Sequence, residues 1–192
     1  MTQNNHPLNR PVVAIIQARM SSSRLPGKAL LPVGGVPMLK RVIDRVSRAG
    51  LIDKVLVATT TDERDDAIQK ACVEWGVAFY RGSLYDVLDR YYQAALQSGA
   101  KTVVRITADC PMIDPGEIDR VIENFFEKDC DFLANRLPPP FKRTTPIGMD
   151  TEVCRFEILE QAWKNASQGF EREHVMPWIY SVEGRARVCV VD

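Results

Sequence analysis

The chain has 192 residues, of which 45% are hydrophobic, and this is enough for one domain with a sizeable core. Its 25 basic and 25 acidic side chains cancel, so the net charge favours neither a nucleic acid nor a membrane as a partner, and an anion site must come from local clustering. The five cysteines include no C-x-x-C pair, which argues against a zinc site and a disulfide framework and favours a reducing cytoplasm.

The chain begins with a polar stretch and a first strand–helix unit. Residues 1–10 predict a flexible tail without the apolar segment of an export signal, and no run of about 18 apolar residues predicts a membrane span. The continuous, mostly β-branched run 12–16 predicts a strand buried on both faces. Pro37 opens a predicted helix that ends at Gly50. Its apolar stripe consists of Met38, Leu39, Val42, Ile43 and Val46.

Strands and helices continue to alternate. Strands are predicted at residues 54–59, 77–79, 102–106, 152–156 and 186–191, and helices at 65–75, 84–97, 157–166 and 171–180. Asp114 starts a further helix with a D-x-x-E capping box and Pro115 at the first helical position. The alternation predicts an α/β fold with a mainly parallel sheet between helices, in a single domain of residues 11–192. Ligands are expected beyond the carboxyl ends of the strands.

The loop from Arg19 to Lys28, directly after the first predicted strand, holds three cations, three serines and one glycine. Arginine grips phosphate oxygens bidentately, lysine adds a compact charge, and hydroxyl and backbone N–H groups complete a cradle. The loop is not a Walker A motif, which would need glycine at Ser22 and a hydroxyl at Ala29, and it contains no G-x-G-x-x-G. It predicts a triphosphate site, with a solvated basic surface loop as the alternative. The candidate nucleotide-binding side chains are Arg19, Ser23, Arg24 and Lys28.

Two further segments follow predicted strands. Asp109 lies just beyond one strand and suits Mg²⁺, which prefers oxygen ligands and takes one or two carboxylates, although an aspartate before Cys-Pro equally predicts a turn cap. Arg81 and Ser83 follow the short strand, where backbone amides and the serine hydroxyl are placed to read a pyrimidine edge. The alternative for Ser83 is the N-cap of the next helix, with Asp86 at the third helical position.

The segment Ile16-Gln17-Ala18-Arg19-Met20-Ser21-Ser22-Ser23-Arg24-Leu25-Pro26-Gly27-Lys28-Ala29-Leu30 resembles the motif of the cytidylyltransferases that activate acidic sugars, the CMP-Kdo and CMP-acylneuraminate synthetases. Residues 35–39 and 57–60 extend the resemblance to the spore coat polysaccharide biosynthesis cytidylyltransferases, and it runs from about Val12 to the last residue. The resemblance implies a Rossmann-like nucleotidyltransferase fold in three α/β/α layers, with CTP over the basic loop. It places Arg19, Arg24 and Lys28 on the phosphates, Ala18 at the nucleoside through its backbone, and residues 107–111 at the metal.

Residues 146–152 and 171–174 resemble segments on the sugar side of such a cleft. Asp150 and Glu152 are candidates for sugar hydroxyls or a second Mg²⁺, although on a strand they equally form one solvated face. Arg172 is a candidate partner for a sugar carboxylate. His174 is a candidate base, although a lone histidine on a helix is more often structural.

The resemblance implies that the anomeric hydroxyl of a 2-keto-3-deoxy acidic sugar attacks the α-phosphorus of CTP and releases pyrophosphate, for surface polysaccharide or glycan biosynthesis. Arg19, Lys28 and Asp109 are then the catalytic residues, and a homodimer is expected. Family members usually carry a further metal-binding aspartate in a segment beyond Asp192, so we expect a truncated chain or a replaced segment. Another nucleotide, a sugar phosphate acceptor and a non-catalytic nucleotide-binding module remain alternatives.

Overall fold

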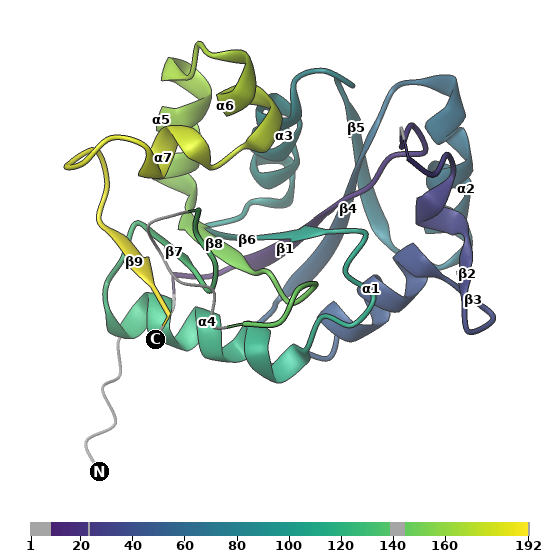
Figure 1. Cartoon of the computed structure of the whole chain (residues 1–192), viewed down its shortest axis with the longest axis horizontal. Coiled ribbons are helices and arrows are strands. Elements are labelled where there is room, and N and C mark those ends of the chain that lie inside the picture. Colours follow the sequence, from purple (N-terminus) through teal and green to yellow (C-terminus); the bar gives the residue numbers. More distant parts are fainter. Residues whose placement is uncertain (1–8, 23, 139–144, 192) are drawn as a thin grey trace.

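A computed structural model describes residues 9–22, 24–138 and 145–191. In this part of the chain the main sheet has seven strands in the order β5-β4-β1-β6-β8-β7-β9 (Figure 1). The strands are β1 (Val12–Gln17), β4 (Lys54–Thr60), β5 (Ala78–Gly82), β6 (Thr102–Thr107), β7 (Phe132–Ala134), β8 (Glu152–Arg155) and β9 (Val188–Val190). All neighbours pair in parallel except β8, which runs antiparallel to both β6 and β7. The predicted α/β fold with a mainly parallel sheet is confirmed.

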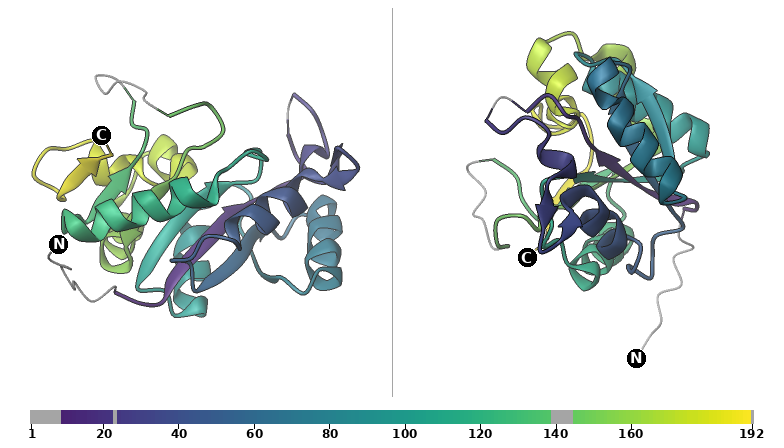
Figure 2. Two further views of the ribbon diagram at one scale, coloured as in Figure 1. Left: turned by 90° about the horizontal axis from the view of Figure 1, so that it is seen from below. Right: turned by 90° about the vertical axis from the view of Figure 1, so that its right-hand side faces the viewer.

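Helices cover both faces of the sheet. They are α1 (Met38–Val46), α2 (Asp66–Glu74), α3 (Val87–Ser98), α4 (Pro115–Glu127), α5 (Phe156–Asn165), α6 (Gly169–His174) and α7 (Pro177–Tyr180). The buried side chains of α1, α2 and α4 form one core on one face, and those of α3, α5 and α7 form a second core on the other (Figures 1 and 2). The longest of these helices, α4, has 13 residues, and no described helix has the length and apolar character to cross a bilayer.

β1 is central because its sequence can be buried on both sides. Val12 to Ile16 have no exposed surface, with alternate side chains in the two cores. The chain leaves β1 toward β4 and β5 and later returns to β6 on its other side, so β1 and β6 flank the point where the strand order reverses. At such a point the loops beyond the carboxyl ends of the strands diverge and leave room for a ligand.

Several predicted boundaries are wrong for local reasons. The first helix ends at Val46 rather than near Gly50, because Ser47 to Ala49 continue as turns. The predicted helix 171–180 is two helices, α6 and α7, with Val175 at φ 74° between them. At the start of α4, Asp114 accepts from the amide of Glu117 as predicted. The Glu117 side chain instead binds Arg120 and Asn135, and it does not complete the capping box.

Three short strands were not predicted. β7 has only three residues, and the pattern after Asp131 is too short to indicate a strand. The strands β2 (Pro32–Val33) and β3 (Val36–Pro37) form a two-stranded hairpin whose turn, Gly34-Gly35, adopts positive φ at both glycines. This geometry favours glycine because it carries no Cβ. The hairpin separates the basic loop from α1.

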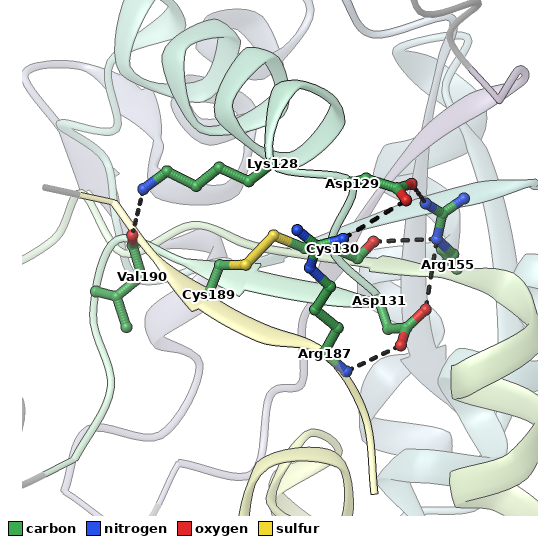
Figure 3. The surroundings of a disulfide bond; sticks show 8 residues. All are labelled: Lys128, Asp129, Cys130, Asp131, Arg155, Arg187, Cys189 and Val190. Atoms are coloured by element: carbon green, nitrogen blue, oxygen red, sulfur yellow. Dashed lines mark hydrogen bonds and ion pairs between the residues drawn. A yellow bond between two sulfur atoms is a disulfide. The ribbon is translucent and has the colours of Figure 1, made fainter. Parts of the chain in front are cut away.

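The prediction of no disulfide is wrong at one pair, because Cys130 and Cys189 are bonded across a separation of 59 residues (Figure 3). Cys130 precedes β7 and Cys189 lies in β9, and the parallel pairing of these strands brings the two residues together. Charged side chains surround the bond. Arg155 pairs with Asp129, and Lys128 donates to the carbonyl of Val190. The cysteines Cys72, Cys110 and Cys154 are free and buried.

Candidate active site

The main candidate site is a cavity of about 230 Å³ at the carboxyl ends of β1 and β6. Each strand supplies one wall. Gln17, Ala18 and Arg19 come from the end of β1, and Thr107 to Asp109 come from the end of β6. The rest is lined by Ser22, Arg24, Lys28, Ala29 and Met38. The cavity therefore lies at the reversal of strand order, where the sequence predicted ligands.

The basic loop folds around the backbone of Met20. The Met20 carbonyl accepts from the amides of Ser22 at 2.9 Å and Gly27 at 2.8 Å, so the two sides of the loop meet at one residue. Gly27 has φ 74°, a left-handed conformation that glycine adopts at little cost. Lys28 follows at once and begins a short 3₁₀ helix (Lys28–Leu30). This turn places Lys28 at the cavity, which Arg19 also lines.

Lys28 and Asp109 meet across the cavity. The Lys28 ammonium donates to Asp109 Oδ2 at 2.8 Å, and the two side chains are 30% and 46% exposed. Burial favours the neutral carboxyl, but the hydrogen bonds from Lys28 and Thr107 outweigh it and hold the pKa of Asp109 below its ordinary value. Asp109 is therefore a carboxylate at neutral pH.

The other predicted nucleotide residues divide into those at the cavity and those away from it. Ala18, Arg19 and Arg24 line it, and among the described residues no carboxylate forms an ion pair with either arginine. Ser23 lies outside the described residues. Arg81 and Ser83 do not line this cavity.

Arg81 and Ser83 have local partners. Arg81 donates to the carbonyl of Thr60 at 2.7 Å and pairs with Asp66 at 2.7 Å, which holds it against α2. The Ser83 hydroxyl accepts from the amide of Asp86 at 3.1 Å, but the N-cap of α3 is Asp86 itself, which accepts from the amide of Asp89. The alternative that Ser83 is the N-cap is therefore wrong, because the cap lies three residues later at Asp86.

A second pocket, of about 380 Å³, adjoins the first and shares Thr107 with it. Asp150, Glu152 and His174 line it, so the structure brings together three of the four predicted sugar-side residues. Its charges are paired. Arg105 and Glu152 face each other in β6 and β8 and form an ion pair, and Arg136 binds Asp150 at 3.0 Å.

Arg172, the fourth sugar-side candidate, is directed elsewhere. Its Nε donates to both oxygens of Asp86 at 3.1 Å, and its Nη1 donates to the carbonyl of Trp163 at 2.7 Å. These bonds tie α6 to the start of α3 and the end of α5. Arg172 is not among the residues that line the second pocket.

Sequence reasoning missed Arg105, Arg136 and Tyr180 in the second pocket. Burial opposes the charge of Arg105, but Glu152 more than offsets it, so the pKa of Arg105 lies above its ordinary value. A charged residue inside an apolar strand was the available signal, because it needs a partner on a neighbouring strand. Asn135 was missed as well. Its amide donates to the Met149 carbonyl and accepts from the Thr151 amide, which holds Asp150 at the pocket.

The donor set fits a magnesium ion only together with a ligand. No group of three metal-binding side chains is found in the described part of the chain, and Asp109 is the one carboxylate lining the main cavity. Mg²⁺ binds through one or two carboxylates, with substrate phosphates and waters as its other ligands. A single carboxylate opposite a phosphate loop satisfies that requirement.

Comparisons with known proteins agree with this geometry. A family described as cytidylyltransferase matches residues 13–187. The chain is 30% identical over 185 residues to the spore coat polysaccharide biosynthesis protein SpsF of Bacillus subtilis. This alignment covers 90% of this chain and 73% of that protein. It is 38% identical over 113 residues to 3-deoxy-manno-octulosonate cytidylyltransferase of Geobacter sulfurreducens, covering 58% and 44%. The solved structure of a cytidylyltransferase from Leptospira borgpetersenii aligns with a TM-score of 0.86 at 33% identity, covering 94% of this chain and 75% of that one.

Proposed function

Because this chain belongs to the cytidylyltransferase family, we propose that it transfers CMP from CTP to a 2-keto-3-deoxy acidic sugar and releases pyrophosphate. The observation that carries the proposal is one cavity in which Arg19, Arg24 and Lys28 face Asp109, beside a second pocket. The names of the relatives from Geobacter and Bacillus support an acidic sugar and a role in polysaccharide biosynthesis.

The main cavity suits the triphosphate because its cations outnumber its carboxylates three to one. A triphosphate carries several negative charges, and guanidinium groups bind phosphate oxygens in pairs. Arg19 and Arg24 form no ion pair among the described residues, whereas Lys28 must exchange Asp109 for a phosphate oxygen. We assign all three to the phosphates and Ala18 to the nucleoside.

Nucleotidyl transfer requires positioning and charge neutralisation rather than covalent chemistry by the protein. Lys28 neutralises charge that builds up on the phosphates, and Arg19 orients them toward the shared residue Thr107. A Mg²⁺ ion bound at Asp109 would polarise phosphate oxygens and favour loss of the proton from the attacking hydroxyl. Asp109 is suited to this because its low pKa keeps it ionised.

The second pocket is assigned to the acidic acceptor. The side chain of Arg136 is 51% exposed, and we assign its guanidinium to the sugar carboxylate. Asp150 and Glu152 accept hydrogen bonds from sugar hydroxyls, while His174 lies at the same pocket. Thr107 joins the two pockets, so an acceptor here lies next to the phosphates.

A pyrophosphate-release assay with Mg²⁺, the four nucleoside triphosphates and a panel of acidic sugars tests the proposal. We expect release with CTP and a 2-keto-3-deoxy acid, and a loss of about a hundredfold or more in Asp109→Ala and Lys28→Ala. Lys70→Ala, an exposed lysine on α2, is the matched control and should keep full activity. Release that prefers another nucleotide or a sugar phosphate, or no release from CTP with any acid sugar, would refute the assignment.

A further inference from the structure

Asp65 is a buried carboxylate at the start of α2 whose side chain does not cap that helix. It is 1% exposed and occupies the N-cap position without a side-chain bond to the helix backbone. The preceding turn is capped by Asp62, which accepts from the amide of Arg64 at 2.9 Å. Helix capping, the usual reason for an aspartate at this position, therefore does not explain Asp65.

The two oxygens of Asp65 bind two different loops. Oδ1 accepts from the backbone amide of Met20 at 2.7 Å. Oδ2 accepts from the amide of Thr60 at 3.2 Å and from its hydroxyl. The carboxylate thus links the loop after β1 to the end of β4. Among the described residues no salt bridge to Asp65 is found, and the hydrogen bonds that its carboxylate accepts come from these three donors.

Met20 is the residue on which the basic loop closes. Its carbonyl receives the amides of Ser22 and Gly27, while its own amide is held by Asp65. Arg19 precedes Met20 directly, and Lys28 follows Gly27. Fixing Met20 therefore fixes the position from which both cations extend into the cavity.

We propose that Asp65 is a positioning residue for triphosphate binding. By accepting from the Met20 amide, it holds the basic loop in the position from which Arg19 and Lys28 line the cavity. The inference rests on the proposed function, because it assumes that a triphosphate binds the loop. Burial of a carboxylate is strongly unfavourable unless hydrogen bonds compensate for its lost hydration, so the buried Asp65 depends on all three donors. A neutral side chain cannot satisfy the same three donors.

The charge of Asp65 and its position act on CTP in opposite directions. Asp65 binds the backbone amide of Met20, the residue that follows Arg19, so its negative charge lies close to the cationic loop. If charge alone mattered, neutralising Asp65 would make the loop more positive and tighten CTP binding. If position matters, neutralising it releases Met20 and weakens binding.

The variant Asp65→Asn separates these outcomes because it keeps the shape and removes the charge. Its one side-chain oxygen can accept from only one of the two loops, and Thr60 offers two donors against one at Met20, so we expect the –NH₂ group to face the Met20 amide and that bond to be lost. We expect CTP to bind about tenfold more weakly by calorimetry, and trypsin to cleave faster after Arg19 and Arg24 in the protein without nucleotide. The cleavage assay needs no nucleotide, so it tests the anchoring even if the wild type binds no CTP.

Thr60→Val is the matched control because it removes the hydroxyl bond to the same carboxylate and leaves the Met20 bond in place. We expect a similar loss of stability but unchanged CTP affinity and unchanged cleavage. If Asp65→Asn does not fold, hydrogen exchange of the wild-type Met20 amide tests the anchor directly, and we expect it to be protected. Unchanged or tighter CTP binding in a folded Asp65→Asn variant, or rapid exchange at Met20, would overturn the proposal.

Discussion

The two pockets hold their arginines in opposite ways. In the main cavity, which we assign to the nucleotide and call the nucleotide cavity, Arg19 and Arg24 form no ion pair with any described residue. In the second pocket, which we assign to the acceptor and call the acceptor pocket, Arg105 is paired with Glu152 and Arg136 with Asp150. One pocket therefore has an excess of positive charge, and the other is close to neutral.

This difference shows how each pocket is held in shape. The ion pairs of Arg105 on β6 with Glu152 on β8, and of Arg136 with Asp150, hold the acceptor pocket in place, so both arginines belong to the fold as well as to the site. Arg19 and Arg24 have no such pair among the described residues, so the nucleotide cavity depends on backbone bonds around Met20 and on the bond of Met20 to Asp65. Removing a charge should damage folding at the acceptor pocket and binding at the nucleotide cavity.

Glu152→Gln is expected to have the largest effect on stability. It leaves Arg105 without its partner in a place where the two side chains are 16% and 17% exposed. Breaking one half of a buried pair typically costs about 3 kcal/mol or more, so urea denaturation should show a loss of about 3 kcal/mol in the free energy of unfolding.

The double variant Arg105→Leu with Glu152→Leu is the control for this effect. Removing both charges leaves no unpaired group, and much of the lost stability should return. A loss below about 0.5 kcal/mol in Glu152→Gln would contradict the contrast, because it would show that Arg105 is no more dependent on its partner than a surface arginine.

Arg24→Met should have the next largest effect, and on binding rather than folding. Loss of a charged bond to phosphate should raise the dissociation constant of CTP by about tenfold to a hundredfold, with a weaker dependence on salt. Because Arg24 has no ion-pair partner among the described residues, the free energy of unfolding should change by less than about 0.5 kcal/mol. Calorimetry measures the dissociation constant of CTP, and urea denaturation measures the free energy of unfolding. A variant that loses stability but binds CTP normally would show that Arg24 acts in folding rather than in binding.

More of the nucleotide cavity than of the acceptor pocket could be predicted from the sequence, because the residues that indicate the nucleotide cavity lie close together in the chain. The β-branched run 12–16 and the cluster of cations in residues 19–28 are contiguous, and a loop after a buried strand must lie at the edge of the sheet. The acceptor pocket depends on the pairing of Arg105 with Glu152, 47 residues apart, which only the antiparallel addition of β8 creates. The disulfide of Cys130 and Cys189 was missed for the same reason.

Residues at helix starts were the hardest to interpret from sequence. Asp65, Ser83 and Asp86 all have side chains that favour capping, and sequence patterns do not show which backbone amides lie nearby. In the structure only Asp86 caps its helix, while Ser83 holds the turn before it and Asp65 binds Met20. Tertiary hydrogen bonds therefore replaced the local ones that the sequence favours.

Lys28→Met should show the smallest of the three expected changes in free energy, a small loss of stability that arises because Lys28 is the one loop cation that has a carboxylate partner among the described residues. The pair is partly exposed, so its loss should lower the free energy of unfolding by less than about 1 kcal/mol at pH 7 and low salt. Lys28 helps to depress the pKa of Asp109 in the folded protein. A depressed carboxyl pKa gives stability that is present above the unfolded value of about 4 and lost as the pH falls through the folded value.

The difference between wild type and Lys28→Met should therefore be largest at neutral pH and disappear in acid, where Asp109 is protonated in both proteins. Urea denaturation of the two proteins across this pH range at low ionic strength measures it, and added salt should shrink it at pH 7. Asp109→Asn is the matched variant, because it removes the same pair from the other side and should show no further change when Lys28→Met is added. A stability difference that persists in acid would contradict the prediction. It would mean that the alkyl chain of Lys28 stabilises the loop by packing and that the ion pair with Asp109 contributes nothing.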